Sequence, residues 1–278
     1  MKTALLAFFA TSIAMYSYAQ TDTSKQERAD TIKIGGMVII KKSDGKDHSQ
    51  DKPVITISNG NGSKKYSNLR TNWGIIDIGF ANINDNTNYA NSQAEGFTAP
   101  GVGEDQFNMR NGKSVNVNLW LFMQRFNLVK HVLNLKYGLG VELNNYHFND
   151  KRVFFQENPT VVVLDEKWKD ANKNKLAADY VTVPIMLSVN FTPGRESGFG
   201  FSGGISAGYL YSARQKFKID GERYKNHDDY NLRPWKLSYI GELNLGPVKL
   251  YGSYAFESMW EKGLDQTPYN VGLRFSRF

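Results

Sequence analysis

The chain contains 278 residues and carries a formal net charge of +7, with 41% hydrophobic residues, 13% aromatic residues and no cysteine. The lack of cysteine excludes a disulfide scaffold and a cysteine-ligated zinc site. The aromatic content argues against a disordered chain. The mean hydropathy of −0.47 by itself favours a water-soluble protein.

The first residues have the features of a secretory signal peptide. Lys2 supplies a positive end, residues 4–14 are almost wholly apolar, and Ser17 and Ala19 place small residues at the −3 and −1 positions of a cleavage site. The apolar run is too short to span a bilayer, which requires about 20 residues. We therefore expect residues 1–19 to be removed and the mature protein to be exported. A buried amphipathic helix is the alternative.

Residues 20–72 are expected to form a basic periplasmic extension. They contain ten Lys or Arg against six Asp or Glu. Two runs with strand composition, 31–40 and 54–58, predict a small hairpin or a tethered segment. The excess positive charge is either solvated or directed at anionic lipid head groups or peptidoglycan.

From residue 73 onward the sequence alternates apolar and polar residues with the period of two that is typical of strands. The predicted strands are 73–83, 114–126, 131–148, 177–192, 198–212, 232–245, 247–258 and 268–278. Short connections alternate with long polar ones, as in outer-membrane barrels with short periplasmic turns and long extracellular loops. The pattern predicts an all-β fold over residues 73–278, an eight-stranded antiparallel transmembrane β-barrel.

The two faces of these strands differ in polarity. In a membrane barrel the apolar face contacts lipid and the polar face lines the lumen. Strand parity places four acids and four bases on the polar face: Asp77, Lys136, Glu142, Lys236, Glu242, Lys249, Glu257 and Arg274. Because an eight-stranded barrel is only wide enough to be filled by side chains, we expect paired charges to plug its lumen. A soluble barrel with these charges in solvent is the alternative.

Aromatic residues near the predicted strand ends fit the interfacial girdles of such barrels. They are Trp73, Phe126, Phe191, Phe199, Tyr209, Tyr211, Trp235, Trp260 and Tyr269. Aromatic residues also favour strands in general, so this evidence is supplementary.

The last strand and two internal motifs resemble a known family. Residues 269–278 form an alternating strand that ends in an aromatic residue, similar to the targeting strand of outer-membrane barrels, with Val271, Leu273, Phe275 and Phe278 as its apolar members. Phe278 departs from the proteobacterial pattern because it falls on the other face. Residues 180–187 (YVTVPIML) and 72–80 (NWGIIDIGF) resemble the outer membrane protein β-barrel domain of Bacteroidota, the PorT-like group. This resemblance implies an outer-membrane location and a small barrel, but no shared reaction.

The sequence offers little sign of catalysis. The four histidines are dispersed, and no serine lies where strand parity would bring it beside a histidine and a carboxylate, as nucleophilic catalysis requires. The glycines at 198–208 alternate with strand residues and precede no helix, so they do not form a phosphate-binding loop. We expect no enzyme activity, no cofactor and no metal. Loop charges of mixed sign argue against a nucleic-acid partner.

One long loop has strand-like character of its own. Residues 152–165 are predicted either to extend the flanking strands, which we favour, or to form a hairpin above the membrane with an edge for a partner strand. Their recruitment into the barrel would raise its strand number to ten.

The expected function is structural, or the binding of a protein partner through the extracellular loops, with outer-membrane lipid and the barrel-assembly machinery as further partners. A narrow diffusion channel, a lipid-directed enzyme and a soluble periplasmic ligand-binding barrel are the alternatives. The family resemblance also suggests an accessory role in secretion or motility.

Overall fold

The computed structural model describes residues 30–34, 37–41, 67–193, 198–246 and 248–276. The chain divides into two units, Met1–Lys65 and Tyr66–Phe278. In the first unit, strands β1 (Asp30–Ile34) and β2 (Met37–Lys41) pair antiparallel. The first predicted run, 31–40, therefore folds back on itself. The second run, 54–58, and the predicted signal peptide, 1–19, lie outside the described residues.

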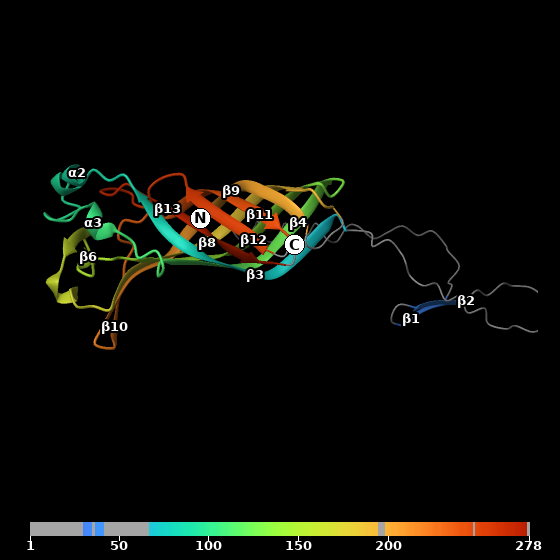
Figure 1. Ribbon diagram of the computed structural model, residues 1–278, viewed down its shortest axis with the longest axis horizontal. Helices are drawn as coiled ribbons and strands as arrows, with labels where there is room; N and C mark the ends of the chain where they lie inside the picture. The colour runs from blue at the N-terminus through green and yellow to red at the C-terminus, as the bar shows by residue number, and fades with distance from the viewer. Residues whose placement is uncertain (1–29, 35–36, 42–66, 194–197, 247, 277–278) are drawn as a thin grey trace, which may run out of the picture. The chain divides into compact units, whose positions relative to one another are not determined.

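In the second unit, eight strands of the described chain form a closed antiparallel ring (Figure 1). Each strand pairs with the next one along the chain, and the last pairs with the first, so the ring has no open edge. The ring strands are β3 (Leu69–Asp85), β4 (Val115–Val129), β5 (Leu133–His147), β8 (Lys173–Asn190), β9 (Phe199–Ile219), β11 (Trp235–Leu245), β12 (Val248–Ala255) and β13 (Gln266–Phe275). They agree with the eight predicted segments to within a few residues at most ends.

Apolar side chains face outwards from the ring and polar ones face inwards. On β3, for example, Ile76, Ile78 and Phe80 are exposed on the outer wall, whereas Asp77 between them is buried. A register shift lies on β4 between Trp120 and Phe122. This arrangement is the reverse of a soluble barrel, in which the apolar face would be buried inside.

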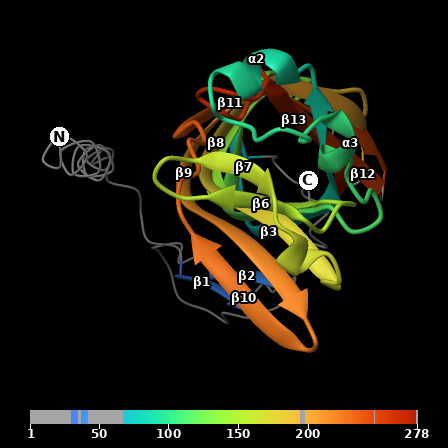
Figure 2. The ribbon, with the colours of Figure 1, turned by 90° about the vertical axis from the view of Figure 1, so that its left-hand side faces the viewer.

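The two ends of the ring differ in structure. One end has short connections, such as residues 130–132 between β4 and β5. The other end carries the additional elements α2 (Tyr89–Ala94), α3 (Glu104–Phe107), β6 (Val153–Gln156), β7 (Val161–Leu164), the 3₁₀ helix η1 (Glu166–Trp168) and β10 (Glu222–His227). Figure 2 shows β6 and β7 lying in front of the ring at this end, with α2 and α3 at its rim. None of the helices among the described residues is long and apolar enough to span a membrane.

Two expectations about the long connections were wrong. Strands β6 and β7 pair with each other in a separate sheet instead of extending the ring strands, so residues 152–165 do not raise the number of ring strands. The long polar connection predicted between the strands 198–212 and 232–245 is instead largely β-structure, because β9 continues to Ile219 and pairs with β10 in a hairpin. The short helices in the first long connection were not predicted.

The long connections share a hydrophobic core with the part of the ring nearest to them. We call this core the cap core. Its buried members are Ala81, Phe97, Val102, Phe107, Tyr146, Phe148, Val153, Phe155, Val162, Leu176, Ala178, Tyr180, Ala213, Tyr230, Leu232, Met259, Trp260 and Leu264. They come both from inward-facing ring positions and from the connections. The connections are therefore packed parts of the fold, stabilised by apolar burial.

Candidate functional site

The lumen contains a buried ion-pair network centred on Arg274. The register of β13 and β3 places Arg274 directly opposite Asp77. The guanidinium Nε and Nη2 of Arg274 lie 2.7 and 2.8 Å from the two carboxylate oxygens of Asp77. Asp77 is 0% exposed and also accepts hydrogen bonds from Trp120 Nε1 at 2.7 Å and Asn118 Nδ2 at 3.1 Å. The bidentate geometry is the one in which arginine binds carboxylates most strongly.

The network continues from Arg274 to β11, two strands away around the ring. Its Nη1 lies 2.7 Å from Glu242 Oε2 on β11. The other oxygen of Glu242 accepts a hydrogen bond from Lys136 Nζ on β5 at 2.9 Å. Lys136 Nζ also donates to Ser202 Oγ at 3.0 Å. Two acids and two bases from four strands are thus linked across the lumen.

A second ion pair joins Glu142 on β5 to Lys236 on β11. Oε1 of Glu142 also accepts from Asn144 Nδ2 at 3.1 Å and from Asn270 Nδ2 at 3.2 Å. The ammonium of Lys236 lies 4.9 Å from the ring centroid of Tyr180, which belongs to the cap core. These contacts supply the hydrogen bonds that a buried charge requires.

The structure brings together most, but not all, of the predicted lumen charges. All are buried except Glu257. Lys249 donates to the carbonyl oxygen and Oγ of Ser276 at 2.7 and 2.8 Å. The assignment of Glu257 to the lumen was wrong: its side chain is 55% exposed and lies 3.5 Å from Arg233. Strand β12 ends at Ala255, so the alternation of faces no longer applies two residues later.

Sequence reasoning missed the uncharged part of this network. Asn116, Asn118, Asn144 and Asn270 are buried and hydrogen-bonded inside the ring. Asn144 and Asn270 share strand parity with the predicted charges of β5 and β13, whereas β4, which contains Asn116 and Asn118, carries no predicted lumen charge.

Above the charges, aromatic side chains of the cap core form a second layer. Phe155 from β6 stacks on Trp260, with ring centroids 5.3 Å apart, and lies 5.6 Å from Tyr230. Its amide nitrogen donates to Gln215 Oε1 at 3.0 Å, which ties the β6–β7 hairpin to ring strand β9. Trp260 was predicted to belong to an interfacial girdle, but it is buried here with its Nε1 bonded to Gln266. Seven other aromatic residues of the predicted girdle are exposed on the outer wall: Trp73, Phe126, Phe191, Phe199, Tyr209, Tyr211 and Trp235.

A cavity of about 30 Å³ lies inside the ring between the network and neighbouring polar residues. Glu142, Thr182, Ser206 and Arg274 contribute to its lining. A cavity of this size has room for about one or two water molecules and is too small for a solute.

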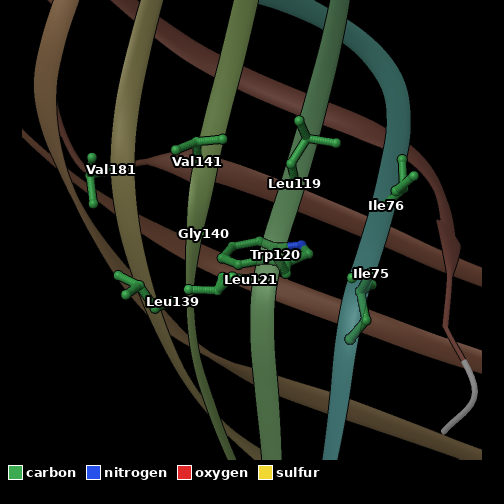
Figure 3. Close-up of a pocket in the computed structure, with 10 residues that line it drawn as sticks. Ile75, Ile76, Leu119, Trp120, Leu121, Leu139, Gly140, Val141 and Val181 are labelled. Atoms are coloured by element: carbon green, nitrogen blue, oxygen red, sulfur yellow. The ribbon is translucent and has the colours of Figure 1, made fainter.

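The outer wall has an apolar hollow of about 470 Å³ (Figure 3). Gly74 and Gly140 lack side chains there, and the remaining lining is aliphatic apart from Trp120. A hollow of this kind on a lipid-facing wall is suited to an acyl chain.

The predicted targeting strand corresponds to β13. Val271, Leu273 and Phe275 are exposed on the outer wall, in line with their predicted contact with lipid. Phe278 lies outside the described residues. The role of this strand in recognition by the assembly machinery stays a prediction.

Within the part of the chain that the structure describes, no group of three or more His, Asp or Glu side chains is placed to hold a metal ion. No curated protein matches the chain significantly. A family model does match: the outer membrane protein beta-barrel domain, over residues 59–258. The closed ring, its apolar outer wall and its charged lumen are the features expected of such a domain. The chain belongs to the outer membrane protein beta-barrel domain family and is located in the outer membrane.

Proposed function

We propose that the protein is a closed, non-enzymatic outer-membrane barrel whose capped end binds a protein partner at the cell surface. In this proposal the short turns face the periplasm and the long connections face outwards. The observation that carries it is the cap core. Loops that share a core with the barrel present a preorganised surface, and preorganisation reduces the entropy cost of binding.

The alternative of a narrow diffusion channel is disfavoured by two layers in the lumen. The lower layer is the network of Asp77, Arg274, Glu242 and Lys136. The upper layer is aromatic and includes Phe155 and Trp260. An ion would have to displace paired charges and then cross an apolar layer.

Planar-bilayer recordings test this closure. We expect the purified, folded protein to give no discrete conductance steps at moderate voltage. Reproducible steps from folded protein, and none from a heat-denatured sample, would support the channel alternative and refute the closed barrel.

The orientation is tested separately with epitope insertions at the two ends. An epitope at the β9–β10 turn, beside Gly221, is expected to be accessible to antibody on intact cells. A matched epitope at the β4–β5 turn, beside Lys130, should become accessible only after the outer membrane is permeabilised. The opposite pattern would reverse the proposed orientation.

The remaining alternatives are distinguished by other observations. A soluble periplasmic barrel conflicts with the exposed apolar wall and with the outer-membrane location. A lipid-directed enzyme would alter lipid A, so an unchanged lipid A profile in a deletion strain supports a non-enzymatic role.

Within the family we place the chain with the PorT-like barrels, on the motif at residues 180–187. An accessory role in secretion or motility fits the proposed partner-binding surface.

A further inference from the structure

A continuous basic surface covers the outer face of strands β8, β9 and β10 beyond the apolar wall. The register aligns Lys175, Lys216 and Lys225 in one row across the three strands. The adjacent row contains Lys173, Lys218 and Arg223. We call these six residues the basic wall.

Acidic groups are scarce on this face. Asp179 lies 2.5 Å from Arg214, so its charge is already matched by a residue outside the two rows. Glu222 alternates with Arg223 and therefore belongs to the opposite face of β10, where its carboxylate accepts a hydrogen bond from Tyr224 at 2.5 Å. The six cations of the basic wall thus have no acid within their own rows.

On the opposite face of the β9–β10 hairpin, aromatic side chains pack against Trp168. Phe217 stacks on Trp168 with ring centroids 4.1 Å apart, and Tyr224 lies 5.3 Å from the same indole. This packing holds β9 and β10 in place and determines which face remains open. Like charges directly opposite each other in a sheet are destabilising, so the folded strands present a repulsive array that an anion would relieve.

The position of the basic wall relative to the membrane narrows the choice of anion. Along β8, the outward-facing apolar residues begin at Val181, which is six residues from Lys175. At about 3.3 Å per residue and a strand tilt near 40°, the Lys175 row lies about 15 Å beyond that level. The head-group layer of a phospholipid bilayer is only about 5–8 Å thick on each side.

We propose that the basic wall binds the phosphate groups of a glycolipid whose charged saccharide head group extends beyond the phospholipid head-group layer. Lys and Arg bind phosphate through charge-assisted hydrogen bonds, and two rows of three cations suit a head group with several phosphates. The apolar wall below contacts the acyl chains of the same leaflet. The inference rests on the proposed orientation, in which this end faces the outer leaflet.

The test uses the full-length mature protein in detergent micelles and purified lipopolysaccharide with a phosphorylated core as the probe. Binding is measured by fluorescence titration at low ionic strength. The test variant, Lys175→Gln/Lys216→Gln/Lys225→Gln, removes one row. The matched control, Lys130→Gln/Lys169→Gln/Lys262→Gln, removes three exposed lysines elsewhere and changes the net charge equally. Heat-modifiable gel migration verifies that every variant is folded.

We expect the row variant to bind at least about tenfold more weakly than wild type, because each cation near an anionic lipid surface contributes severalfold to affinity. The control variant should bind within about twofold of wild type. Enzymatically dephosphorylated lipopolysaccharide should bind wild type as weakly as the intact probe binds the row variant.

Three results would overturn the proposal. Equal binding of intact and dephosphorylated probe would exclude phosphate recognition. Equal losses in the row and control variants would show only a net-charge effect. If vesicles made of a mixture of phosphatidylglycerol and phosphatidylcholine bound wild type as tightly as lipopolysaccharide does, recognition of an extended head group would be excluded. Since binding in micelles does not depend on orientation, failure here refutes the site, whereas failure of the epitope experiment refutes the proposed function.

Discussion

Among the contacts in the lumen, the ion pair between Asp77 and Arg274 is the one whose removal should destabilise the protein most. Asp77→Asn keeps the size of the side chain but removes one negative charge. It also replaces one accepting oxygen with an NH2 donor, which would face the donors of Arg274, Trp120 and Asn118. The linked group of two acids and two bases would then carry one uncompensated buried positive charge. Breaking a buried ion pair by removing one partner costs about 3–5 kcal/mol.

Unfolding in urea, followed by the fraction of heat-modifiable protein in lipid vesicles, measures this cost. With a slope of about 3 kcal/mol per molar urea for a protein of this size, the midpoint should fall by about 1 to 2 M. The matched control is Glu257→Gln, which breaks the exposed Arg233–Glu257 pair. Surface pairs contribute about 0–1 kcal/mol, so its midpoint should shift by less than about 0.3 M.

A double variant completes the design. Asp77→Asn/Arg274→Gln restores charge balance, because Glu242 still pairs with Lys136. We expect it to be less destabilised than the sum of the two single variants, as coupled residues are. Equal midpoints for Asp77→Asn and Glu257→Gln would refute the claim that the lumen network stabilises the barrel.

Three further predictions concern the cap, the wall and pH. Phe155→Ala should destabilise the protein by about 3–5 kcal/mol through a cavity in the cap core, and a urea midpoint unchanged from wild type would contradict this. Gly140→Ala should lower the same midpoint because a Cβ there would lie 2.7 Å from the indole of Trp120, whereas Gly203→Ala, with open space, should not. Burial, followed by repulsion from Arg110, lowers the pKa of Lys151 to about 8. Below about pH 8, Lys151 is therefore protonated in both the folded and the unfolded protein. Between about pH 8 and its ordinary pKa of 10.5, it is protonated in the unfolded protein and neutral in the folded protein. The stability of wild type should rise relative to Lys151→Gln from pH 8 to 9.5, and a constant difference between their urea midpoints would refute the shift.

Several features of the fold were predictable because they depend on strand periodicity alone. Alternation identified the ring strands and assigned Asp77, Glu142 and Arg274 to the lumen, where the structure buries them. Parity is reliable only within a strand, which is why Glu257, two residues after β12, was placed wrongly.

The cap could not be predicted from the same pattern. Its core combines residues far apart in the sequence, such as Phe107, Phe155 and Trp260, and no local period connects them. Trp260 shows the consequence: composition and position suggested a membrane girdle, but packing against Phe155 buries it.

The strands and their inward and outward faces could be predicted without a structure, because the period of two is a local property of an extended backbone. Three features are visible only in the folded chain: which charges pair, how the long connections pack at one end of the ring, and that six cations of β8, β9 and β10 lie side by side. These depend on strand register and long-range packing, which join residues that the sequence keeps apart. The low mean hydropathy is the average of an apolar wall, a charged lumen and a polar surface, and only the fold separates them.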